Sequence, residues 1–108
     1  MKVSIKPDAK LSVPSRFVNP GFVWAIAFPI IVSAYQELGY ECVVTEGCGG
    51  THSERSRHYD GLALDLRTNH MKADHRLELA VNLSTALGPE FDVVMESDHT
   101  HVEWDPKP

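Results

Sequence analysis

Two short segments of the chain carry residues that could hold a metal ion. In the first, residues 56–65 (SRHYDGLALD), His58 and Asp65 flank a glycine. In the second, residues 98–101 (DHTH), His101 follows a carboxylate at a spacing of three. Two imidazoles and one carboxylate are a common ligand set for catalytic zinc, which keeps its fourth position open. The sequence therefore predicts a zinc site made of His58, Asp65 and His101.

A further carboxylate near such a site can serve as a general base towards the attacking water. Asp98, three residues before His101, is the first candidate for this role. A solvated carboxylate in the turn before a strand is the alternative for Asp98. Glu96 and Glu103 are the other candidate bases, and Glu103 shares a strand face with His101.

Two other histidines are predicted to support the site without binding the metal. His99 lies on the same strand face as the last ligand, and His52 lies in the polar segment before the first one. Either could orient a ligand or stabilise an oxyanion. A rival cluster of Cys48, His52 and His58 is allowed by spacing alone, but it leaves the carboxylate and the last histidine of the first set unexplained.

The pattern of apolar residues predicts an α+β fold with a small, mainly antiparallel sheet and two main helices. In the segment 62–67, the leucines alternate with Ala63, Asp65 and Arg67, so the leucines anchor a strand and Asp65 points to the other face. If His101 faces the same side of a neighbouring strand, the two side chains converge. Helices are predicted at 20–38 and 71–87, and strands at 40–45, 62–67, 91–95 and 99–104.

The two predicted helices differ in their patterns. The first has a capping Asn19, Pro20 at its first position and a terminating Gly39, while Pro29 predicts a kink or a split. Its apolar residues lie on nearly every side, which predicts that the helix is well buried. The second shows a core-facing stripe of five residues. That stripe comprises Leu77, Ala80, Val81, Ser84 and Leu87.

The N-terminal third allows two interpretations. Residues 22–35 are apolar and follow basic residues, which resembles a signal peptide. A buried core helix is preferred, because removing the segment would take away a large part of a small domain. The stretch is too short to span a bilayer. Residues 1–19 are predicted to form an extended arm that packs on the domain.

Size and charge limit the classes of function. A chain of 108 residues forms one domain, here taken as residues 1–108, and is expected to be a monomer. Its net charge of −5 argues against nucleic acid as a partner, because no basic patch is available for phosphates. Cys42 and Cys48 are predicted to be free thiols rather than a disulfide that closes a very short loop.

The first motif resembles that of a known family. The pattern S-x-H-x-x-G-x-A-x-D is fully matched from Ser56 to Asp65, and the closing segment 101–104 (HVEW) is also similar. The family comprises zinc D-alanyl-D-alanine carboxypeptidases and dipeptidases and phage L-alanyl-D-glutamate endopeptidases, and it shares its fold with the Hedgehog signalling domain. The resemblance covers roughly residues 20–106.

This resemblance implies zinc bound by the three predicted ligands and Asp98 as the catalytic carboxylate, where many members have Glu. It implies that Ser56 contacts substrate, although a turn-capping hydroxyl is equally compatible with the sequence. Many members bind a substrate carboxylate with an arginine before the first ligand. Residues 45–50 contain none, which makes Arg57 the substrate-binding candidate here, with Arg55 and Arg67 as alternatives.

The implied function is hydrolysis of a peptide bond in the peptidoglycan stem peptide. The enzyme would be either an endolysin-like L-alanyl-D-glutamate endopeptidase or a D,D-carboxypeptidase. A phage-encoded enzyme would stay in the host cytoplasm until its release to the cell wall, and any other would be periplasmic or extracellular. A non-catalytic zinc-binding module of the same fold is the main alternative, and a phage structural protein is a third.

Overall fold

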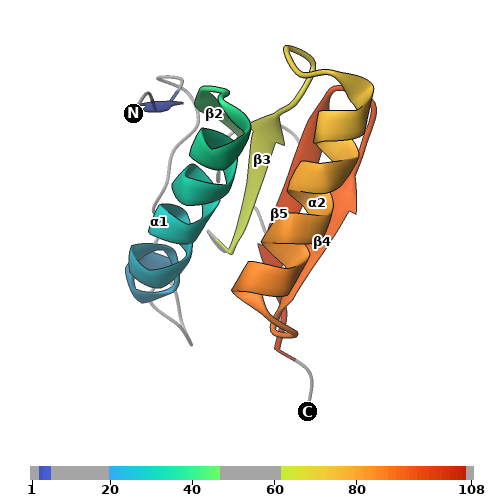
Figure 1. Ribbon diagram of the computed structural model, residues 1–108. Coiled ribbons are helices and arrows are strands. Elements are labelled where there is room, and N and C mark those ends of the chain that lie inside the picture. Colours follow the sequence, from blue (N-terminus) through green and yellow to red (C-terminus); the bar gives the residue numbers. More distant parts are fainter. Residues whose placement is uncertain (1–2, 6–19, 47–61, 107–108) are drawn as a thin grey trace.

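The computed structural model describes residues 3–5, 20–46 and 62–106. These residues form two helices and a five-stranded sheet (Figure 1). The predicted α+β class with two helices is therefore confirmed. The elements are β1 (Val3–Ile5), α1 (Pro20–Leu38), β2 (Cys42–Glu46), β3 (Ala63–Arg67), α2 (Ala73–Leu87), β4 (Phe91–Met95) and β5 (His99–Trp104).

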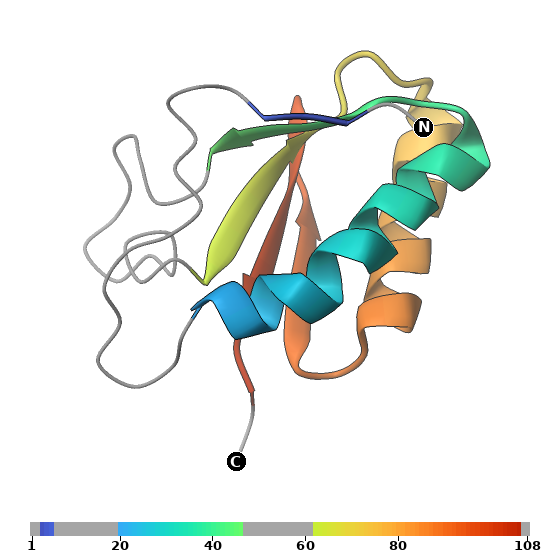
Figure 2. The same ribbon diagram turned by 90° about the vertical axis from the view of Figure 1, so that its left-hand side faces the viewer.

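The strands are arranged in the order β1-β2-β3-β5-β4. Among the described strands, β1 pairs with β2 in parallel and the other three pairings are antiparallel, as the sequence predicts for most of the sheet. The strand β1 lies within the predicted N-terminal arm, of which residues 1–2 and 6–19 are outside the described part. Both helices lie on the same side of the sheet (Figure 2), so the sheet has one face towards the helices and one away from them.

The helix α1 ends as its sequence predicts. Gly39 has a φ of +82°, and its amide donates to Gln36, while the amide of Tyr40 donates to the carbonyl of Tyr35. This pair of bonds is the Schellman arrangement, which satisfies the last carbonyls of a helix. Because the amide of Tyr40 is used in this way, β2 begins at Cys42 rather than at residue 40.

Pro29 does not split α1, which runs as one helix through this position. A proline removes the amide that would bond to the carbonyl of Ala25. Ala25 and Pro29 are both exposed, so water can satisfy that carbonyl. The helix is well buried along one face but not on every side, since Ile26 is 72% exposed. The buried face consists of Trp24, Ala27, Ile31, Val32, Ala34 and Tyr35.

The helix α2 faces the sheet mainly with residues outside the predicted stripe, although Leu87 of that stripe does pack against the core. Leu79 and Leu83 are fully buried, whereas Leu77 and Val81 are 57% and 55% exposed. Leu77 and Val81 form one apolar row at a spacing of four, and Leu79 and Leu83 form another. The two rows lie on different sides of the helix, and the second one faces the core. The helix also begins at Ala73 rather than at residue 71.

The core lies between the helices and the inner face of the sheet. Leu64 and Leu66 of β3 and Val102 of β5 are buried there against α1 and α2. At the edge of the sheet formed by β4, the rings of Trp24 and Phe91 meet with centroids 6.3 Å apart. Because side chains alternate along a strand, the residues between these apolar positions face the other side of the sheet.

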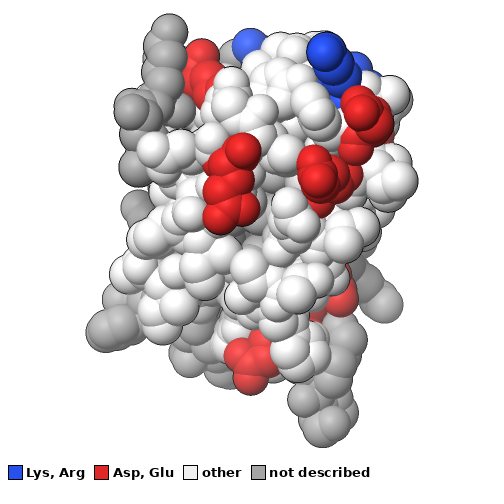
Figure 3. Space-filling view, viewed as in Figure 1, with Lys and Arg blue, Asp and Glu red and all other residues white. Residues whose placement is uncertain are grey.

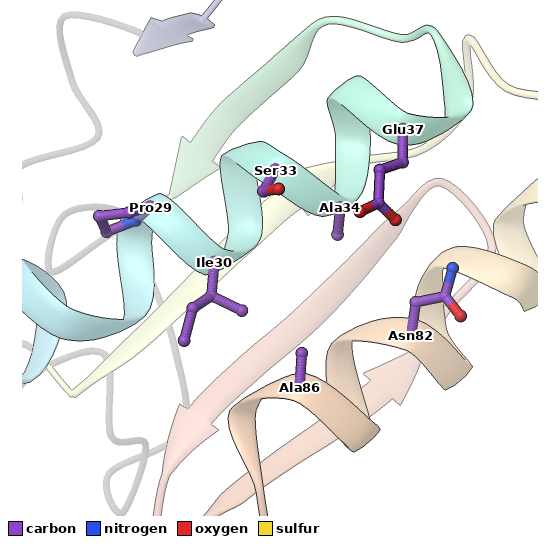
Figure 4. A pocket seen from close by; sticks show the side chains of 7 residues that line it. All are labelled: Pro29, Ile30, Ser33, Ala34, Glu37, Asn82 and Ala86. Carbon is purple, nitrogen blue, oxygen red and sulfur yellow. The ribbon is translucent and has the colours of Figure 1, made fainter.

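The outer surface of the helices is largely uncharged. Acidic side chains are scattered over it, and basic ones gather at one end (Figure 3). A groove between the helices has Pro29, Ile30, Ser33, Ala34 and Glu37 on one side and Asn82 and Ala86 on the other (Figure 4). Among the described residues, neither helix combines the length and the apolar character needed to cross a membrane.

The two leucine stripes of α2 allow a matched test. Truncation of the buried side chain in Leu79→Ala is expected to lower the free energy of unfolding by about 2–5 kcal/mol, because a cavity remains in the core. The exposed Leu77→Ala is expected to change it by no more than about 0.5 kcal/mol. Urea unfolding of both variants checks this. Similar losses in the two variants would show that the helix packs through another face.

Candidate metal centre

The pairing of β3 with β5 brings two of the predicted ligands together. In this antiparallel register, Asp65 lies directly opposite His101. Their neighbours Leu64 and Val102 are buried against the helices, so Asp65 and His101 project from the other face of the sheet. The convergence expected from the sequence is therefore found. The carboxylate of Asp65 is almost buried, with 12% of its side chain exposed.

The imidazole of His101 lies between two carboxylates. Its Nδ1 is 3.0 Å from Oδ1 of Asp65, and its Nε2 is 3.1 Å from Oε1 of Glu103. Both nitrogens donate in these bonds, which requires the protonated ring. The hydrogen bond to Asp65, helped by Glu103 and opposed by burial, raises the pKa of His101 to about 9. Without a metal, this ring is therefore cationic at neutral pH.

The same two donor atoms fit a zinc ion. In tetrahedral zinc sites with bonds of about 2.0–2.2 Å, neighbouring ligand atoms lie about 3.4 Å apart. The observed 3.0 Å between Asp65 Oδ1 and His101 Nδ1 is within a few tenths of an ångström of that separation. A nitrogen and a carboxylate oxygen are also donors that zinc prefers. The described pair thus offers two atoms of the kinds that zinc takes as ligands, at a separation that is also normal for a hydrogen bond.

His99 connects Asp98 to the candidate centre. Its Nδ1 is 2.7 Å from Oδ1 of Asp98, and its Nε2 is 2.7 Å from Oε2 of Glu96 and 3.8 Å from Oδ1 of Asp65. Burial lowers the pKa of His99, but the bond to Asp98 and the neighbouring carboxylates outweigh it and raise the pKa overall. His99 therefore lies beside Asp65, one of the predicted ligands.

Asp98 itself lies at the edge of the site. Its side chain is 68% exposed, and the hydrogen bond from His99 lowers the pKa of its carboxyl group. Asp98 is therefore ionised at neutral pH, as a general base must be. The structure places the imidazole of His99 between Asp98 and Asp65.

Several predicted residues lie outside the part of the chain that the structure describes. They are Cys48, His52, Arg55, Ser56, Arg57 and His58. The third zinc ligand and the substrate contacts of the first motif therefore remain predictions from the sequence. Arg67, the remaining candidate for the substrate carboxylate, pairs in register with His99. Its side chain thus projects from the same face of the sheet as the site.

A second candidate metal-binding group consists of carboxylates alone and includes Glu103, the residue bonded to His101. The side-chain oxygens of Asp92, Glu103 and Asp105 are all within 4.8 Å of one another, so these residues could hold a metal ion. The sequence alone does not show these three residues as a group. The alternation of Glu103 and Asp105 is visible in the sequence, but Asp92 joins them only through the register of β4 with β5, in which it pairs with Glu103.

Comparison with known proteins adds no relative. No protein-family model, no curated protein and no solved structure matches the chain. A functional interpretation therefore rests on the motif at residues 56–65 and on the geometry around Asp65 and His101.

The two contacts of His101 predict a pH-dependent stability of the metal-free protein. The pKa of His101 rises from its ordinary 6.5 to about 9 on folding. Its stabilising contribution is therefore complete below the lower value and is lost as the pH rises through the upper one. We expect the free energy of unfolding to fall by on the order of 1 kcal/mol, because solvent screens the partly exposed ring.

Urea unfolding in the presence of a chelator, measured between neutral and alkaline pH, checks this expectation. His101→Gln lacks the titrating group and should show a flatter profile over the same range. An equally steep decline in the variant would assign the effect to other residues.

Proposed function

We propose that the protein is a zinc-dependent peptidase that hydrolyses a bond in the peptidoglycan stem peptide. The observation that carries this proposal is the direct cross-strand pairing of Asp65 with His101, whose donor atoms are 3.0 Å apart. These residues are separated by more than thirty positions in the chain, and both belong to the motifs that resemble the zinc peptidase family. His58, the third ligand of that motif, completes the proposed zinc site.

The proposal gives a role to the metal ion and to each of the four residues around it that the structure describes. Zinc, when bound, would polarise the scissile carbonyl and make the attacking water more acidic. Asp65 and His101 would hold the ion, and Asp98 would accept the proton from the attacking water and pass it to the leaving amine. The lowered pKa of Asp98 supports this role, because the carboxylate is ready to accept a proton at neutral pH. His99 would orient Asp98 through their 2.7 Å bond.

The non-catalytic zinc-binding module remains the second candidate, and one observation favours it. The carboxylate of Asp98 is largely exposed and bonds to His99. A general base must come within hydrogen-bond reach of the water that it activates. A chain in which Asp98 keeps only this outward contact would bind zinc without hydrolysing peptides.

Zinc affinity shows whether the ion binds at Asp65 and His101 or at the acidic group of residues 92, 103 and 105. We expect the protein to bind one zinc ion, and Asp65→Asn to weaken that binding by at least about 100-fold, because it removes an anionic ligand. Asp92→Asn is the matched control, since it neutralises a carboxylate of the acidic group at residues 92, 103 and 105. Competition titration with a chromophoric chelator measures both. A larger loss in the control would move the metal site to the acidic group.

Hydrolysis is tested with purified peptidoglycan of several stem chemistries, with products identified by mass spectrometry. We expect a new stem-peptide fragment, and a rate about 100-fold to 10,000-fold lower in Asp98→Asn, which removes the proton acceptor and keeps the side-chain shape. Asp74→Asn changes an exposed carboxylate in the first turn of α2 and should leave the rate unchanged. Zinc binding without a product from any wall type would favour the non-catalytic module.

A further inference from the structure

Glu103 approaches the candidate zinc ligand His101 from the side opposite to Asp65. The two nitrogens of an imidazole point in widely different directions, and Asp65 takes Nδ1 while Glu103 takes Nε2 at 3.1 Å. An ion held between Asp65 and Nδ1 would therefore have the ring of His101 between itself and this contact with Glu103. That placement argues against Glu103 as a base or a ligand of the same ion.

The fold fixes the position of Glu103. It lies two residues after His101 on β5, so both side chains project from the same face of the sheet. Its backbone is paired on one side with Ala63 of β3 and on the other with Asp92 of β4. Ala63, directly opposite it on this face, is fully buried. Glu103 extends along the strand to the ring, with only 22% of its side chain exposed.

The contact has a chemical consequence for the ligand. A carboxylate that accepts the Nε2 proton stabilises the tautomer in which Nδ1 carries the free lone pair. It also fixes the plane of the ring and makes Nδ1 a stronger donor to a metal. Histidine ligands in metalloproteins usually donate their second ring N–H to such a partner. Nδ1 is the nitrogen that faces Asp65, the other described ligand.

We propose that Glu103 is a positioning residue that holds the His101 imidazole with Nε2 protonated and Nδ1 turned towards Asp65 and the metal. This inference rests on the zinc site of the proposed function. It assigns Glu103 to the support of a ligand rather than to proton transfer or to the acidic group with Asp92 and Asp105.

Zinc affinity provides the first test. Glu103→Ala should weaken zinc binding about 10-fold to 100-fold while one ion is still bound. Glu103→Gln should lose less, because its amide oxygen can still accept from Nε2. Asp105→Asn is the matched control, since it removes a charge from the same acidic group but not the oxygen bonded to His101. Equal losses in the alanine variant and the control would overturn the proposal in favour of a general charge effect.

The second test observes the protons on the two nitrogens of His101 directly and is done without metal. Long-range proton–nitrogen NMR spectra identify which nitrogen of His101 carries a slowly exchanging proton. In the metal-free parent protein, whose ring is protonated at both nitrogens, we expect slowly exchanging protons at Nδ1 and at Nε2. The Nε2 signal should be kept in Glu103→Gln and lost in Glu103→Ala, while the Nδ1 signal, bonded to Asp65, should stay in both variants. An unchanged Nε2 signal in the alanine variant would overturn the inference. A parent protein that binds no zinc would instead overturn the proposed function, and the NMR result would still decide whether Glu103 orients the ring.

Discussion

The candidate site depends on the register of two antiparallel strands. Asp65 of β3 and His101 of β5 become neighbours only because these strands pair with Ala63 opposite Glu103 and Arg67 opposite His99. A slip of one residue would turn one strand over relative to the other and place its polar side chains in the core. The apolar residues of the same strands resist that slip, because Leu64, Leu66 and Val102 are held against the helices.

The two faces of the sheet therefore have different tasks. The inner face supplies the apolar area that stabilises the fold. The outer face carries several carboxylates and two histidines, which repel or attract one another according to their protonation. Without a metal, His101 offsets the negative charge of Asp65 and Glu103 as a cation. A bound divalent ion would take over that balancing role and release the proton.

Much of this arrangement follows from local sequence patterns. The alternation in β3 and β5 is strict, so the facing of Asp65 and His101 could be predicted, and both ends of α1 carry clear signals at Pro20 and Gly39. The buried stripe of α2 could not be predicted, because Leu77 and Leu79 fit a helical pattern equally well until the sheet selects one. The partner of Nε2 in His101 could not be predicted either, because side-chain contacts depend on rotamers that the sequence does not specify.

The order of the strands has a consequence for how the site is assembled during synthesis. The strand β5 lies between β3 and β4 in the sheet, yet it is the last of the five to be translated. Until residues 99–104 leave the ribosome, β3 lacks its antiparallel partner on that side and Asp65 has no imidazole opposite it. Contacts between residues 36 positions apart, such as this one, form late because a long loop must close first. A chain in which β5 has not yet joined the sheet leaves that edge of β3 unpaired, and unpaired strand edges favour aggregation.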